Sequence, residues 1–241
     1  MPGHADKICL ALDLHDERQI LSAVDEFRDL VGYFKINSAF TLFGPTLVTA
    51  MIDAGARIFL DIKLHDIPNT LDGYGEAVTQ LGVHIVTVHT AGGRVMLERF
   101  IQSADATGQR LGTARPKLIG ISLLTSIDRK TMNDELNIPG SIEDEVLRRG
   151  MLAATAGLDG LVCSAGELGY IKEHLPTSFY YVTPGVRPSG SSSDDHLRIV
   201  SYGDAIQAGS NLLVVGRAVL GSRSPRDALL SLHDEIAAAG G

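Results

Sequence analysis

Short apolar runs alternate along the chain with longer stretches in which apolar residues recur at helical spacing. The short runs predict β-strands at residues 8–13, 33–37, 57–63, 83–89, 117–124, 160–163, 179–183 and 211–216. The amphipathic stretches predict helices at 16–30, 69–81, 94–111, 141–156, 165–173 and 225–238, and another that ends near residue 54. This regular alternation predicts the α/β class, as a single closed (β/α)8 TIM barrel.

A doubly wound open sheet is the alternative arrangement of such a pattern, but the Gly-x-Gly-x-x-Gly loop of dinucleotide-binding sheets does not follow the first strand. No linker divides the chain, so we expect one domain over residues 1–241. Residues 128–139 are polar and predict a loop with a short helical turn. Residues 185–195 are rich in Gly and Ser and follow a strand, which favours a lid over a merely disordered surface loop.

Composition narrows the possible classes of protein. The 241 residues are 44% hydrophobic and carry a net charge of -8, which argues against nucleic-acid and membrane-surface partners. Both cysteines, Cys9 and Cys163, lie in apolar runs and are expected in the core. The first residues resemble no signal peptide, and no apolar run reaches the ~18 residues of a membrane span. We therefore expect a cytoplasmic location.

Charged residues interrupt three of the predicted strands. Side chains alternate along a strand, so Asp61 and Lys63 share a face that is opposite to the aliphatic face of the same strand. Lys35 lies between two apolar neighbours, and Asp13 is in phase with small residues of the first strand. We expect all four charges at the C-terminal mouth of the barrel, where barrel enzymes carry out chemistry. A buried salt-bridge network that only stabilises the fold is the alternative.

The predicted loop after the third strand continues this pattern. Asp66 lies three residues beyond Lys63, and Pro68 disfavours helical backbone at Ile67. Thr70 is placed either to cap the next helix or to offer its hydroxyl.

Arginines follow the last two predicted strands. Gly216 allows close backbone approach and Arg217 can bind a phosphate through two hydrogen bonds, while Arg187 follows the seventh strand. Phosphate sites in barrels commonly lie at these two strand ends. Arginines that are simply on the surface are the alternative.

Taken together, these residues resemble the bacterial-type orotidine 5′-monophosphate decarboxylases. The most specific segment is Asp-Ile-Lys-Leu-His-Asp-Ile-Pro-Asn-Thr at 61–70. Shorter matches, in the same order as in that family, are found at 11–13, 34–35, 124–126, 183–188 and 215–217. The resemblance covers about residues 7–230.

The resemblance implies a homodimer that converts orotidine 5′-monophosphate to uridine 5′-monophosphate (UMP) and carbon dioxide without a metal or organic cofactor. By resemblance, Lys63 is the proton donor in a catalytic charge chain that also contains Lys35, Asp61 and Asp66. Asp66, Ile67 and Thr70 would reach the site of the neighbouring subunit. The remaining substrate contacts it implies are Asp13 and Lys35 to ribose, Thr125 and Ser126 to the pyrimidine, and Arg187, Gly216 and Arg217 to phosphate. Pro184 and His196 are also expected to bind the substrate.

One position departs from the family pattern. His196 stands where the family has a glutamine that bridges the phosphate and the base edge, and Ser201-Tyr202 replaces a Thr-Pro pair. A histidine can donate and accept hydrogen bonds but cannot copy both amide contacts. Two other functions remain open. One is a metal-dependent sugar-phosphate decarboxylase or aldolase of the same superfamily, and the other is a non-catalytic nucleotide-binding barrel.

Overall fold

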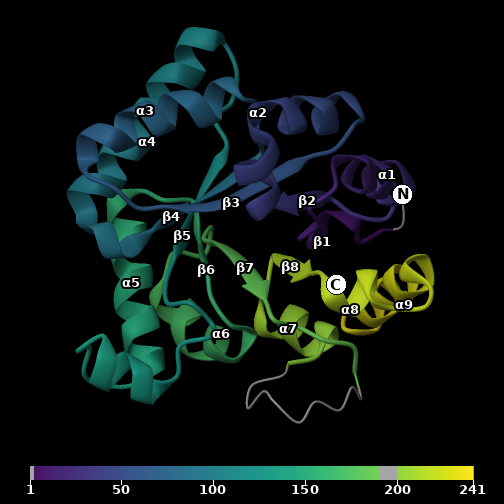
Figure 1. The fold of residues 1–241 in the computed structure, drawn as a ribbon. Helices are drawn as coiled ribbons and strands as arrows, with labels where there is room; N and C mark the ends of the chain where they lie inside the picture. The colour runs from purple at the N-terminus through teal and green to yellow at the C-terminus, as the bar shows by residue number, and fades with distance from the viewer. Residues whose placement is uncertain (1–2, 190–199, 241) are drawn as a thin grey trace.

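A computed structural model describes residues 3–189 and 200–240. Within these residues, parallel strands close into a barrel in the order β1-β2-β3-β4-β5-β6-β7-β8 (Figure 1). The β8 strand pairs with β1 through Leu213 and Ile8, which seals the ring. The predicted TIM barrel is therefore confirmed, and the open sheet is excluded.

The bounds of the elements are close to those predicted. The strands are β1 Ile8–Ala11, β2 Tyr33–Ile36, β3 Ile58–Leu64, β4 Ile85–His89, β5 Lys117–Ile121, β6 Gly160–Val162, β7 Tyr180–Pro184 and β8 Leu212–Val215. The helices are α1 Glu17–Phe27, α2 Ser38–Asp53, α3 Pro68–Gln80, α4 Gly93–Leu111, α5 Ile142–Ala156, α6 Ala165–Ile171, α7 Tyr202–Ala208, α8 Arg217–Leu220 and α9 Pro225–Ala238.

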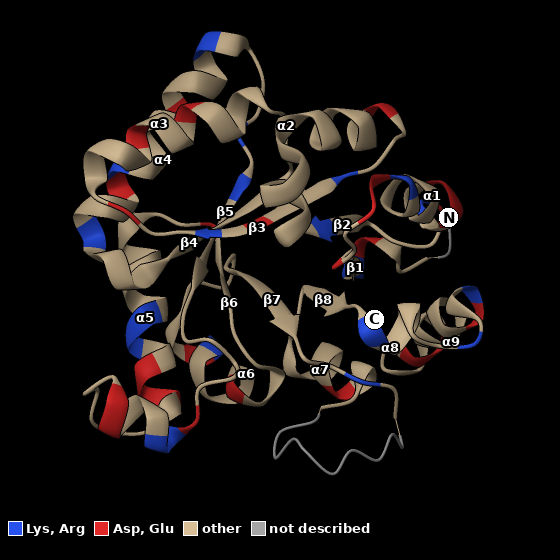
Figure 2. Cartoon of the chain, in the orientation of Figure 1, with Lys and Arg blue, Asp and Glu red and all other residues tan. Residues whose placement is uncertain are grey.

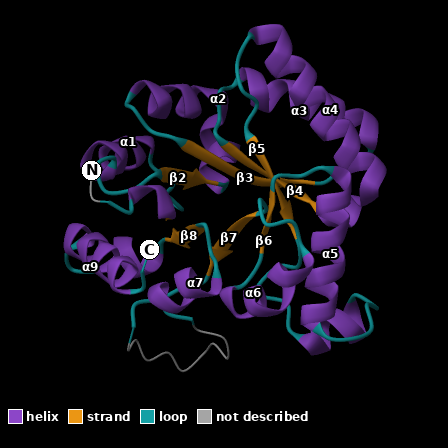
Figure 3. Ribbon diagram, turned by 180° about the vertical axis from the view of Figure 1, so that it is seen from behind, coloured by secondary structure: helices purple, strands orange, loops and turns teal. Residues whose placement is uncertain are grey.

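Apolar side chains fill two concentric layers. The larger layer lies between the strands and the helices that surround them (Figure 3). The smaller one fills the barrel itself and includes Cys9, Phe59 and Ile85. Figure 2 shows charged residues mainly on the outer helices, whereas the strands are mostly uncharged apart from positions on β2 and β3 and from Lys117 at the start of β5. The alternation predicted for β1, β2 and the first half of β3 is thus confirmed.

Two short helices were not predicted. α7 begins after Ser201, whose hydroxyl accepts a hydrogen bond from the backbone N–H of Asp204. This Ser-x-x-Asp spacing is a helix-start signal, but it leads into only seven helical residues. α8 has four residues, too few for a periodic pattern. The predicted turn within 128–139 is present as a single π-helical turn at Thr131–Glu135.

The first and last helices lie side by side (Figure 1). The Arg226 guanidinium donates to the carbonyl of Glu26, and the His233 ring contacts the carbonyl of Leu30 at 2.8 Å. These contacts hold α9 against the region of α1, next to the pairing of β8 with β1. In the described residues, no helix has the length and hydrophobicity needed to cross a membrane.

Candidate active site

Four charged side chains from three adjacent strand ends form a chain of alternating sign. The Lys35 Nζ lies 3.4 Å from Asp13 Oδ1 and 3.5 Å from Asp61 Oδ2. The Lys63 Nζ donates to the same Asp61 Oδ2 at 2.9 Å. Asp61 is therefore held between two ammonium groups, and its side chain and that of Lys35 are each only 11% exposed. The structure thus brings together the four charges that strand alternation predicted.

The backbone at Lys63 departs from the regular strand geometry on which the predicted alternation of side chains depends. Its φ of 49° lies in the left-handed region, which non-glycine residues rarely adopt. The register with β4 shifts between Leu60 and Leu64, so β3 bulges at this point. Backbone strain of this kind is concentrated at functional sites.

Sequence reasoning missed Thr87 on β4, which is fully buried. Its hydroxyl accepts a hydrogen bond from the backbone N–H of Lys63 at 3.0 Å and donates to Asp61 Oδ1 at 2.9 Å. The sequence did contain an indication of this role. Thr87 is a polar residue two positions after Ile85, so both face the inside of the barrel, where Ile85 packs.

A cavity of about 710 Å³ opens next to the charge chain. Its walls come from the C-terminal ends of β1, β2, β7 and β8 and from the segments that follow β5, β6, β7 and β8. The predicted site residues in its wall are Asp13, Lys35, Thr125, Ser126, Pro184, Arg187, Gly216 and Arg217. Cavities of this size accommodate ligands such as a nucleotide.

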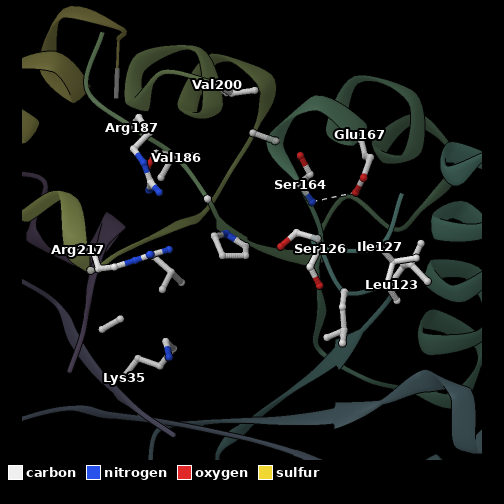
Figure 4. Close-up of a pocket in the computed structure, with 18 of the residues that line it drawn as sticks. Lys35, Leu123, Ser126, Ile127, Ser164, Glu167, Val186, Arg187, Val200 and Arg217 are labelled. Carbon is white, nitrogen blue, oxygen red and sulfur yellow. Dashed lines mark hydrogen bonds between the residues drawn. The ribbon is translucent and has the colours of Figure 1, made fainter. Parts of the chain in front are cut away.

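The two predicted phosphate-binding arginines face the cavity from one side, with Ser126 across from them and Lys35 near its floor (Figure 4). Gly216 lies close to β1: a Cβ atom added to it would be only 3.3 Å from the Cβ of Ala11. Such a wall suits an anion bound at the arginines, with the rest of the ligand extending toward Lys35.

Other predicted residues do not line this cavity. Asp61 and Lys63, on β3, are not part of the cavity wall. Asp61 pairs with Lys35, which is. Asp66 and Ile67 are exposed beyond β3, and Thr70 lies in the first turn of α3. His196 and the predicted lid residues 190–195 lie outside the described residues.

Two groups near the charges, the buried Cys9 thiol and the half-buried His89 ring, remain neutral around pH 7. Burial raises the pKa of the Cys9 thiol well above its usual range, although Lys35 opposes this shift. The pKa of His89 is lowered, first by burial and then by the charges of His65, Arg149 and Lys63. Neither group therefore adds a charge to the site.

A closed barrel with a charge chain and an arginine-lined cavity at its C-terminal mouth defines a TIM-barrel enzyme that acts on a phosphorylated small molecule. The family model described as Orotidine 5'-phosphate decarboxylase / HUMPS family matches residues 6–232. The chain belongs to this family.

Full-length relatives carry the first of these two family names. The orotidine 5'-phosphate decarboxylase of Moorella thermoacetica is 38% identical over 232 residues, which are 96% of this chain and 92% of that protein. The enzyme of the same name from Vibrio campbellii is also 38% identical, covering 96% and 97% of the two chains. The crystal structure of orotidine 5'-phosphate decarboxylase from Lactobacillus acidophilus superimposes with a TM-score of 0.83 at 30% identity, covering 95% of this chain and 98% of that one.

Proposed function

We propose that the protein decarboxylates orotidine 5′-monophosphate to UMP and carbon dioxide, the last step of de novo pyrimidine nucleotide synthesis, without a metal or organic cofactor. The observation that carries this proposal is the Lys63–Asp61 pair, with its 2.9 Å contact, beside a cavity lined by Arg187 and Arg217. The proposal is also supported by two relatives named orotidine 5'-phosphate decarboxylase, which are 38% identical to this chain over nearly the full length of both proteins.

The chemistry explains why a fixed ammonium group is needed. Loss of carbon dioxide from C6 leaves an electron pair in the plane of the ring, out of conjugation with the ring carbonyls. An ammonium group about 4 Å away stabilises such a charge by about 4 kcal/mol at an effective dielectric constant of about 20. Lys63 then donates a proton to C6, and Asp61 keeps Lys63 charged and oriented.

The remaining residues bind the substrate in this proposal. Arg187, Arg217 and the amide of Gly216 bind the phosphate, and Asp13 and Lys35 hold the ribose hydroxyls. Thr125 and Ser126 face the pyrimidine, Pro184 also contacts the substrate, and His196, which lies outside the described residues, is a ligand of the phosphate or of the base edge. Because the phosphate is remote from C6, its binding energy can be used to assemble the charged site.

A direct assay separates this function from the two alternatives. Purified protein is expected to remove the absorbance of orotidine 5′-monophosphate and to do so equally well after treatment with EDTA. If the protein is instead a metal-dependent sugar-phosphate enzyme, any decarboxylation observed in this assay would stop in EDTA and return with Mg²⁺. A non-catalytic nucleotide-binding barrel would bind UMP and leave the substrate unchanged. Either result would contradict the proposal.

The same proposal includes a homodimer in which Asp66, Ile67 and Thr70 reach the partner's site. Within the described residues Asp66 forms no ion pair, and its carboxylate accepts only the backbone N–H of Ile67. Three apolar side chains beside this mouth are largely exposed, namely Leu42 at 57%, Ile67 at 64% and Val95 at 61%. They follow β2, β3 and β4, which are neighbours in the barrel. A second copy of the chain would cover this apolar surface.

Mixing two inactive variants tests the shared site. If Asp66 acts on the partner's Lys63, a mixed dimer of Lys63→Ala and Asp66→Ala contains one intact site and one that lacks both groups. We expect mixing to restore about a quarter of the wild-type activity, because about half of the dimers are mixed. If the mixture remains as inactive as its parents after subunit exchange, Asp66 acts within its own chain.

The proposal also places the enzyme in the cytoplasm. Cys9 and Cys163 are both buried free thiols, which is usual in reducing compartments.

A further inference from the structure

The hydroxyl of Thr87 links Asp61 and Lys63, two neighbouring members of the charge chain. Thr87 has no exposed surface and lies on β4, whereas Asp61 and Lys63 belong to β3. One hydroxyl group contacts the backbone of Lys63 and the side chain of Asp61. Because its side chain is fully buried, Thr87 does not face a ligand.

The bulge in β3 explains why this contact exists. Leu60 pairs with Val86 and Leu64 pairs with Val88, so four residue steps on β3 face only two on β4. The regular ladder is interrupted there, and the backbone N–H of Lys63 donates to Thr87 Oγ1 instead. Without this acceptor, a partly buried amide in a strained segment would lose its hydrogen bond, which is costly.

The direction of the two hydrogen bonds is fixed by chemistry. A backbone N–H can only donate, so the Thr87 hydroxyl accepts from Lys63 and gives its single proton to Asp61 Oδ1. An unprotonated carboxylate oxygen is the acceptor this bond requires. The other oxygen of Asp61, Oδ2, is thereby turned toward the ammonium groups of Lys63 and Lys35.

We propose that Thr87 is a positioning residue for the decarboxylation. It holds the backbone of Lys63 in its left-handed conformation and orients the Asp61 carboxylate, so that the ammonium group is aimed at C6 as charge develops there. The inference rests on the proposed function. Because Thr87 acts through Lys63 and Asp61, its removal should affect the chemical step more than substrate binding.

Removal of the hydroxyl with little change in shape tests this role. Thr87→Val is expected to lower kcat by about 10- to 30-fold, with KM and the Kd of UMP within about threefold of wild type. A UMP analogue with an anionic oxygen on C6, which imitates the developing charge, should lose about as much affinity as kcat loses. Thr87→Ser keeps the hydroxyl and should recover kcat to within about threefold of wild type.

A second buried threonine provides the matched control. Thr79 in α3 is 5% exposed, and its hydroxyl donates to the carbonyl of Gly75. Thr79→Val therefore also loses a buried hydrogen bond, but it should leave kcat and both affinities unchanged. If Thr87→Val does not fold, Thr87→Cys replaces it, because a thiol of similar size is a weak hydrogen-bond partner.

The possible results separate this inference from the proposed function. If wild-type protein does not decarboxylate orotidine 5′-monophosphate, the proposed function fails. If wild type is active and Thr87→Val retains its kcat, or loses affinity equally for UMP and the anionic analogue, the positioning role is wrong. Failure of Thr87→Ser to recover activity would also overturn it, because the hydroxyl would then not be the group that matters.

Discussion

Replacing Lys63 with alanine is expected to lower kcat by at least ~10⁴-fold while the Kd of UMP stays within about tenfold of wild type. The variant loses both the cation beside C6 and the proton donor. Its fold should survive, because the Lys63 side chain is 31% exposed and Asp61 keeps its contacts with Lys35 and Thr87. Loss of substrate absorbance measures kcat, and titration calorimetry with UMP measures binding.

Lys130→Ala is the matched control for this experiment. Lys130 is 78% exposed and pairs with Asp134 in the loop region that follows β5. Its removal deletes the same chemical group and should leave turnover near wild type. If Lys63→Ala retained turnover within about threefold of wild type, Lys63 could not be the proton donor that the mechanism requires.

The second large effect is expected at the phosphate end of the cavity. Arg217→Ala should reduce kcat/KM by about 10²-fold, mainly through KM, because hydrogen bonds to a charged group contribute about 1.5–3 kcal/mol. The Kd of UMP should rise by a similar factor, whereas that of uridine should not change. Arg217→Lys should recover only part of the loss, since an ammonium group cannot make the paired hydrogen bonds of a guanidinium.

Arg28 offers a control far from the mouth of the barrel. It follows α1, and its guanidinium pairs with Asp25 and donates to the carbonyl of Ala54. Arg28→Ala should leave the affinity for UMP and uridine unchanged. If Arg217→Ala weakens both ligands equally, the substitution has disturbed the cavity rather than removed a phosphate contact, and the assigned role of Arg217 is wrong.

Periodicity was sufficient to predict the barrel because its strands and longer helices each carry a clear pattern. The inward phase of Lys35 and Asp61 also followed from alternation, since aliphatic neighbours marked the opposite face. The pattern failed at α7 and α8, which are shorter than the window that periodicity needs. Strand ends were predicted too long in β1, which ends at Ala11, and in β5, which ends at Ile121, because apolar residues such as Leu12 and Leu123 follow these strand ends in the sequence.

The site was harder to predict where it depends on pairing between strands. A bulge is a mismatch in register between β3 and β4, and neither strand shows it alone. The contacts of Thr87 depend on that mismatch, so they could not be read from the sequence. The roles of Asp66, Ile67 and Thr70 came only from resemblance, and they remain predictions because they concern a second copy of the chain.

The left-handed backbone at Lys63 also has a consequence for the evolution of the enzyme. A non-glycine residue in this conformation costs about 1–2 kcal/mol, so selection for stability alone would favour glycine at position 63. The chain instead carries its proposed proton donor there, supported by Thr87. At position 63, the residue that would favour stability differs from the one that the proposed reaction needs. Selecting variants for higher thermal stability would therefore not select for activity at this position.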